Sequence, residues 1–195
     1  MAVHPQLPNA ITIARILCAP VFLWLLLADD GRGGGLRWAA AVVFIVAIAT
    51  DGIDGYIARR YDIVSDLGKL LDPIADKALT GVAFVGLSLL GELPWWVTII
   101  VLIREIGITI YRFIVVSDHV LAAAWMGKLK TVAQAVALSI ALVPFAGLSD
   151  ASAWQNTVWW VSVITMTIAV VLTIASGLDY VVTEIRAARK GRVAR

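Results

Sequence analysis

The chain has 195 residues, of which 61% are hydrophobic and only 15% are charged. A soluble domain has roughly 45–50% apolar and about 25% charged residues, so this composition argues against a soluble protein. The formal net charge of +2 is too small to indicate a nucleic-acid partner, and the single cysteine, Cys18, excludes an internal disulfide.

Six apolar segments follow one another along the chain. They cover roughly residues 10–28, 36–60, 72–90, 95–116, 130–148 and 154–178. The second segment is purely apolar only to Ala49, so it reaches the length of about 20 residues that a transmembrane helix needs only if the helix continues through Asp51 and Asp54. With no soluble domain or internal repeat between these segments, the sequence predicts one domain over residues 1–195. We expect an all-α integral membrane protein with a bundle of six transmembrane helices.

Basic residues gather at one side of this predicted bundle. They lie between the second and third segments, around the fourth connection, and in the tail after Leu178: Arg59, Arg60, Lys69, Arg112, Lys128, Lys130, Arg186, Arg189, Lys190, Arg192 and Arg195. The positive-inside rule therefore predicts that both termini face the cytoplasm, with the tail against anionic lipid headgroups. The opposite interface is predicted to carry a belt of tryptophans: Trp95, Trp96, Trp154, Trp159 and Trp160.

Four aspartates interrupt the apolar pattern in the stretch DGIDGYIARRYDIVSDLGKLLDPIADK, residues 51–77. Ionisable side chains inside a membrane are costly and usually mark function. On a helix, the first group shares one continuous face: Asp51, Asp54, Gly55, Ala58 and Arg59. The second group shares a face of the next helix: Gly68, Asp72 and Asp76.

Two antiparallel helices with these faces would direct four carboxylates at one point. Such carboxylates repel one another unless hard divalent cations such as Mg²⁺ or Mn²⁺ lie between them. The small residues Gly55, Ala58 and Gly68 leave room for a nucleotide, and Arg59 suits a phosphate. Three structural alternatives stay open: Asp72 as the N-cap before Pro73, an ion pair of Asp51 or Asp54 with Arg59 or Arg60, and a close helix contact at Gly55 and Ala58.

The spacing D-x2-D-G-x2-A-R-x8-G-x3-D-x3-D, which this stretch matches without a gap, resembles the signature of the CDP-alcohol phosphotransferases. The resemblance implies that an acceptor hydroxyl attacks the phosphorus of a CDP-linked lipid and that CMP leaves. It implies that Asp51, Asp54 and Asp72 hold two divalent cations. Asp76 would contact a metal and accept the proton of the attacking hydroxyl.

The donor pocket follows from the same resemblance. The residues implied to bind the CDP-lipid are Gly55, Ala58, Arg59, Gly68, Ser65, Pro8 and Asn9. The family resemblance also implies a homodimer. The positive-inside rule predicts that the aspartate stretch, and with it the active site, faces the cytoplasm from the cell membrane.

The acceptor is not reported by the signature. The stretches LPNAITIARI, LGKLLDPIADK, WWVTIIVLIREIGITIYR and GKLKTVAQ resemble the bacterial members that use glycerol 3-phosphate and CDP-diacylglycerol to make phosphatidylglycerophosphate. A phosphorylated acceptor needs cations, and the candidates are Arg104, Arg112, Lys128 and Lys130. Alternatively, Glu105 neutralises Arg104, and the two lysines extend to the membrane interface.

Three other functions are weighed against this one. An inositol-phosphate acceptor would use the same chemistry and the same cations. A cardiolipin synthase is disfavoured because its acceptor is a large lipid. A divalent-cation transporter would distribute its acidic residues along a path across the bilayer, whereas here they gather beside an arginine and small residues.

Overall fold

The computed structural model describes the backbone of residues 7–61, 66–114 and 124–193, and the side chains of residues 13–50, 77–111 and 125–186. These backbone ranges contain six α-helices, one short 3-10 helix and no strand, which confirms the all-α prediction for them. The elements are α1 (Leu7–Asp29), α2 (Gly35–Tyr61), α3 (Asp66–Leu89), α4 (Trp95–Ile114), α5 (Ala124–Leu142), η1 (Phe145–Leu148) and α6 (Ser152–Val193).

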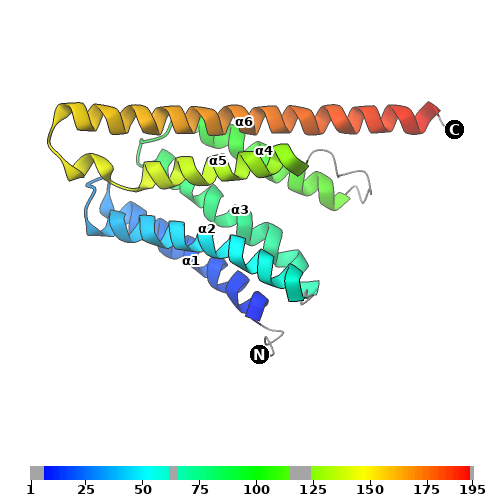
Figure 1. Ribbon diagram of the computed structural model, residues 1–195, viewed down its shortest axis with the longest axis horizontal. Coiled ribbons are helices and arrows are strands. Elements are labelled where there is room, and N and C mark those ends of the chain that lie inside the picture. The colour runs from blue at the N-terminus through cyan, green and yellow to red at the C-terminus, as the bar shows by residue number, and fades with distance from the viewer. Residues whose placement is uncertain (1–6, 62–65, 115–123, 194–195) are drawn as a thin grey trace.

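The helices lie side by side and alternate in direction (Figure 1). Helix α1 packs against α2 and α3, α5 packs against α6, and α4 joins the two groups by contacting α3 and α6. The described connections α1–α2, α3–α4 and α5–α6 therefore lie at one end of the bundle. At the other end α6 extends beyond its neighbours.

The core between α1, α2 and α3 is aromatic. Phe22, Phe44 and Phe84 are fully buried, and the ring centroids of Phe22 and Phe44 are 5.6 Å apart. A Cβ atom at Gly86 would lie 2.6 Å from Cδ2 of Leu26, so a larger residue here would require the buried Leu26 side chain to shift.

A polar cluster fixes the end of the bundle where these connections lie. Arg37 of α2 donates from Nη1 and Nη2 to the two carboxylate oxygens of Glu92, at 2.8 and 2.6 Å. It also donates to the carbonyl oxygens of Leu142 and Ala141, at 2.8 and 2.9 Å. Asp29 accepts from the backbone N–H groups of Gly33, Gly34 and Arg37, so it caps the start of α2. Arg37, Glu92 and Asp29 are called the Arg37 cluster below.

Two predicted boundaries beside the aspartate stretch can be checked on the backbone. Helix α2 continues to Tyr61, which confirms that its helix runs through Asp51 and Asp54. The interpretation of Asp72 as an N-cap is wrong, because α3 begins six residues earlier at Asp66. Gly68, Asp72 and Asp76 thus stand within one helix, as their shared face requires.

The fifth and sixth helices differ from the prediction. Helix α5 begins at Ala124, not after Lys130, because Met, Lys, Leu and Ala are good helix formers even where hydropathy is low. It ends at Leu142, since the residue before Pro144 is disfavoured in the α conformation. Helix α6 continues through the polar tail to Val193, because the Arg, Lys and Ala residues of the tail are also good helix formers.

By length and composition, one helix within the described residues qualifies as a membrane span, over Ser152–Arg186 of α6. Shorter apolar helical stretches cover Gly35–Thr50 and Lys77–Leu89. The described outer surface is rich in large apolar side chains: Trp24, Ile103 and Trp125 are 65%, 68% and 70% exposed. The five predicted belt tryptophans are also exposed, and they lie within the first turn of α4 and the first nine residues of α6.

Candidate functional site

The predicted metal and nucleotide residues lie on two consecutive helices. Asp51, Asp54, Gly55, Ala58 and Arg59 belong to the last part of α2, and Gly68, Asp72 and Asp76 belong to the first part of α3. Their backbone is helical, but their side chains lie outside the described residues, so the convergence of the four carboxylates stays a prediction. The same holds for the side chains of Pro8, Asn9 and Arg112, and Ser65 lies outside the described residues altogether.

A second charged site lies wholly among the described side chains, and one of its residues, Lys77, directly follows Asp76 in the chain. Glu105 of α4 is 7% exposed and receives cations from three helices: Lys77 of α3, Arg104 of α4 and Lys130 of α5. We call these four residues the Glu105 cluster. The cluster lies where α3, α4, α5 and α6 meet, because Arg104 also contacts α6.

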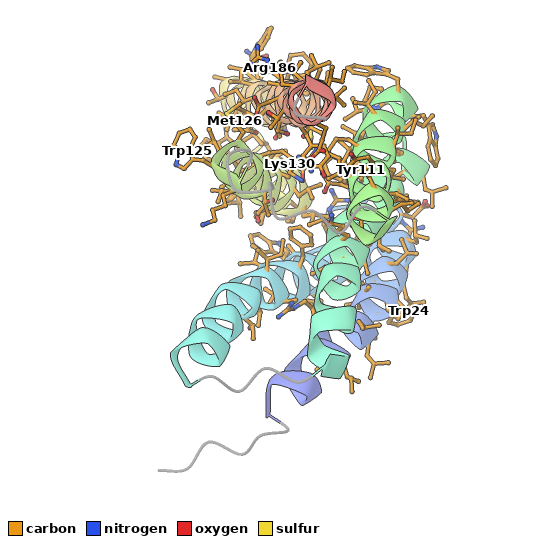
Figure 2. The ribbon with its side chains drawn as sticks, turned by 90° about the vertical axis from the view of Figure 1, so that its right-hand side faces the viewer. Trp24, Tyr111, Trp125, Met126, Lys130 and Arg186 are labelled. Atoms are coloured by element: carbon orange, nitrogen blue, oxygen red, sulfur yellow. The ribbon has the colours of Figure 1, made fainter. Side chains whose placement is uncertain are left out.

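Lys130 is the most deeply buried cation of the cluster. Its side chain is 4% exposed, and Nζ donates a short hydrogen bond to Oε1 of Glu105. Figure 2 shows Lys130 turned inward between α5 and α4, whereas Trp125 of the same helix points away from the molecule. The alternative in which Lys130 extends to the membrane interface is therefore wrong, because its ammonium group is paired inside the bundle.

Arg104 is held from two sides. Its Nη1 lies 3.2 and 3.3 Å from the carboxylate oxygens of Glu105, and its Nη2 donates to Oγ of Ser176 at 3.1 Å. A Cβ atom at Gly177 would lie 3.3 Å from Cγ of Arg104, so the glycine leaves room for the arginine stem. The buried Nε of Arg104 has no hydrogen-bond partner in the described part of the chain. Neutralisation by Glu105 is confirmed, but it leaves donor capacity on the guanidinium.

Lys77 is a site residue that the sequence interpretation missed. Its Nζ lies 3.6 Å from Oε2 of Glu105 and donates to Oγ1 of Thr109. Thr109 in turn donates to the backbone carbonyl of Glu105 at 2.7 Å. The available signal was a lysine immediately after Asp76, the last aspartate of the signature.

The charges of the Glu105 cluster do not balance among the described side chains. Three cationic groups face a single carboxylate, in a region where Glu105 and Lys130 are buried. Buried charges are normally paired, because taking an unpaired charge out of water is costly. Ammonium and guanidinium groups arranged in this way suit a phosphate, whose oxygens accept several charge-assisted hydrogen bonds.

The remaining two predicted cations stand apart from this group. Lys128 is exposed, and it lies two residues before Lys130, a spacing that does not share a helix face. Arg112 lies eight residues after Arg104 on α4, which is close to the same face, but its side chain is outside the described residues.

No group of three or more His, Cys, Asp or Glu side chains that fits a metal ion occurs among the side chains described. The predicted ligands are not among them. Four carboxylates on two helical segments are nevertheless the oxygen donors that Mg²⁺ and Mn²⁺ prefer, so the chemistry of the predicted set fits a divalent cation.

The sequence profile of the CDP-alcohol phosphatidyltransferase family matches residues 5–176. This range includes the whole aspartate signature and the Glu105 cluster.

Curated proteins are similar over nearly the full chain. A protein of Mycobacterium tuberculosis named "Probable phosphatidylglycerophosphate synthase" is 41% identical over 181 residues, which is 93% of this chain and 82% of that protein. A protein of Bacillus subtilis named "CDP-diacylglycerol--glycerol-3-phosphate 3-phosphatidyltransferase" is 38% identical over 90% of this chain and 93% of its own length. One of Rickettsia bellii with the same name is 33% identical over 92% of this chain and 96% of its own length.

Proposed function

This chain belongs to the CDP-alcohol phosphatidyltransferase family, and we propose from that premise that it transfers a phosphatidyl group from CDP-diacylglycerol to glycerol 3-phosphate. The products are phosphatidylglycerophosphate and CMP. The names of relatives that are 33–41% identical over most of the chain support this acceptor. The single observation that carries the proposal is the Glu105 cluster, in which three cations face one carboxylate among the described side chains and one of these cations, Lys77, directly follows Asp76 in the chain.

The donor is proposed to bind between the end of α2 and the start of α3. Asp51, Asp54, Asp72 and Asp76 would hold two divalent cations, Mg²⁺ or Mn²⁺. These cations would neutralise the diphosphate and the charge that develops at phosphorus. The CDP-lipid contacts proposed from the signature are Gly55, Ala58, Arg59, Gly68, Ser65, Pro8 and Asn9.

The transfer itself needs one proton acceptor. Asp76 takes the proton of an acceptor hydroxyl as that oxygen attacks the phosphorus of the lipid. A new phosphorus–oxygen bond forms, and the bond to the CMP oxygen breaks. A general base must lie within hydrogen-bond reach of the hydroxyl, so the acceptor has to be held beside Asp76, near the middle of α3.

The phosphate of the acceptor is proposed to bind to Lys77, Arg104 and Lys130. Two of these residues, Arg104 and Lys130, are among the four cations predicted from the sequence, and Lys77 is added to them. The three cationic groups come from three helices and surround the carboxylate of Glu105. Arg112 is proposed as a further contact because it stands near the same face of α4 as Arg104. Lys128 is not placed in this phosphate site, because its side chain is exposed and lies on a different face of α5 from Lys130.

We propose that all six helices cross the cell membrane, with both termini and the active site on the cytoplasmic side. The exposed apolar side chains on every described helix and the tryptophans at one end support this placement. The helical tail of α6 would then extend into the cytoplasmic interface, and a homodimer of the single 1–195 domain is proposed from the family resemblance. Labelling of single cysteines from either side of sealed vesicles tests the orientation.

An acceptor panel tests the reaction. The purified full-length protein is supplied with CDP-diacylglycerol and Mg²⁺ or Mn²⁺, and CMP release is measured with glycerol 3-phosphate, inositol phosphate, inositol, serine or phosphatidylglycerol. Release with glycerol 3-phosphate is expected. Release with inositol phosphate but not glycerol 3-phosphate would contradict the proposal and assign the inositol-phosphate reaction instead.

The base is tested in the same assay. Asp76→Asn should lower turnover by at least about a hundredfold, the scale of a lost general base, while CDP-diacylglycerol still binds in the presence of metal. Binding is measured separately from turnover with labelled CDP-diacylglycerol. Near-normal turnover would remove Asp76 from this role.

A further inference from the structure

Glu105 holds the three cations together. Arg104 and Lys130 share its Oε1, and Lys77 lies 3.6 Å from its Oε2. Its backbone carbonyl also accepts from Thr109 at 2.7 Å. The three cations come from three different helices, so the carboxylate joins α3, α4 and α5 at one buried point.

Stability alone is a poor reason for this arrangement. A buried ion cluster often contributes less to folding than well-packed apolar residues of the same volume, because desolvation of the charges offsets their attraction. A second carboxylate would also balance the cluster better than one does. The excess of cations among the described side chains therefore points to a binding role, and the position of Glu105 at the centre points to control over where those cations stand.

We propose that Glu105 is a positioning residue for the acceptor phosphate, an inference that rests on the proposed function. In the acceptor-free protein its carboxylate holds Lys77, Arg104 and Lys130 at one point. When glycerol 3-phosphate binds, the cations keep this arrangement and direct their remaining donors to the phosphate oxygens. Glu105 itself does not touch the reacting atoms.

The cations have enough N–H donors to bind Glu105 and a phosphate at the same time. Lysine has three N–H donors and arginine has five. The hydrogen bond from Lys130 to Glu105 uses one donor of Lys130, and the buried Nε of Arg104 is unused among the described residues. Without the carboxylate, three like charges would repel one another and move apart, so phosphate binding would have to bring them together again at a cost in affinity.

The test compares Glu105→Gln with a matched control, Glu92→Gln. Both variants replace a carboxylate that pairs with an arginine, but Glu92 belongs to the Arg37 cluster at the other end of the bundle. In steady-state kinetics of CMP release, E105Q should raise the KM for glycerol 3-phosphate about tenfold or more. The KM for CDP-diacylglycerol should change less than about twofold, and E92Q should leave both values as in the wild type.

Glu105→Asp covers the case in which E105Q does not fold. It keeps the charge that the cations need but moves the carboxylate back by one methylene, so its KM for glycerol 3-phosphate should lie between those of the wild type and E105Q. The inference is overturned if folded E105Q keeps the wild-type KM, or if E105Q fails to fold while E105D keeps the wild-type KM. It is also overturned if E105Q lowers kcat and leaves both KM values unchanged.

A failure of the proposed function can be distinguished from a failure of the positioning role of Glu105. In that case the wild type itself would release no CMP with glycerol 3-phosphate, before any variant is compared.

Discussion

The molecule contains two described ionic clusters of opposite character. In the Arg37 cluster, one guanidinium donates to both oxygens of one carboxylate and to two backbone carbonyls, while Asp29 accepts three backbone N–H groups. In the Glu105 cluster, three cations share one carboxylate, and a buried donor of Arg104 has no partner among the described residues.

The difference separates a structural role from a binding role. A buried charge with four of its five donors in hydrogen bonds to the protein, such as Arg37, fixes the chain and has little left for a ligand. A cluster with surplus cations is completed only when an anion arrives. The Arg37 cluster also ties α1, α2, α5 and the α3–α4 connection together at one end, whereas one member of the Glu105 cluster, Lys77, directly follows the aspartate signature in the chain.

The largest effect on stability is expected at the satisfied cluster. Arg37→Met removes four hydrogen bonds and leaves Glu92 and two carbonyl oxygens without their donor. The free energy of unfolding should fall by about 3 kcal/mol, because groups left unpaired inside a protein are costly. Denaturant titration in mixed micelles measures it. The KM for glycerol 3-phosphate of the folded fraction should stay at the wild-type value. A raised KM would contradict the assignment of a purely structural role to the Arg37 cluster.

The opposite pattern is expected for the unbalanced cluster. Lys130→Gln removes one cation of three, so Glu105 keeps Arg104 and Lys77 as partners and stability should change little. The KM for glycerol 3-phosphate should rise about 30-fold, which corresponds to about 2 kcal/mol for a hydrogen bond to a charged group. Steady-state CMP release measures it. A loss of stability with an unchanged KM would place Lys130 with the structural residues.

A smaller effect tests the geometry of Arg104. Gly177→Ala adds a Cβ atom 3.3 Å from Cγ of Arg104, so the arginine stem must shift by a few tenths of an ångström. The KM for glycerol 3-phosphate should rise about threefold, or roughly 0.7 kcal/mol, with the KM for CDP-diacylglycerol unchanged. An equal rise in both KM values would indicate general damage to the packing of α6.

Hydropathy and helical spacing predicted much of this fold. The six helices, their order and the continuation of α2 through Asp51 follow from apolar runs and from shared faces. The start of α5 and the length of α6 were missed, because hydropathy marks the apolar part of a helix, while Lys, Met, Gln and Arg continue it equally well. Asp72 was assigned an N-cap alternative because Asp-Pro often starts a helix, but here one turn and more of helix precedes it.

The second site could be predicted only in part. Arg104 and Lys130 were identified as phosphate candidates because they are cations in apolar surroundings. That Glu105 and Lys77 join them depends on packing of α3 against α4 and α5, which no spacing within one helix reports. Ser176 and Gly177 come from α6, about 70 residues further along the chain, and nothing in their local sequence marks them.

An experimental structure with glycerol 3-phosphate bound tests the central claim most directly. We predict that the phosphate lies within hydrogen-bond distance of Lys77, Arg104 and Lys130, with the free hydroxyls toward Asp76 and Glu105 still holding the cations. A phosphate bound elsewhere, with the pairs of the Glu105 cluster unchanged, would contradict the account.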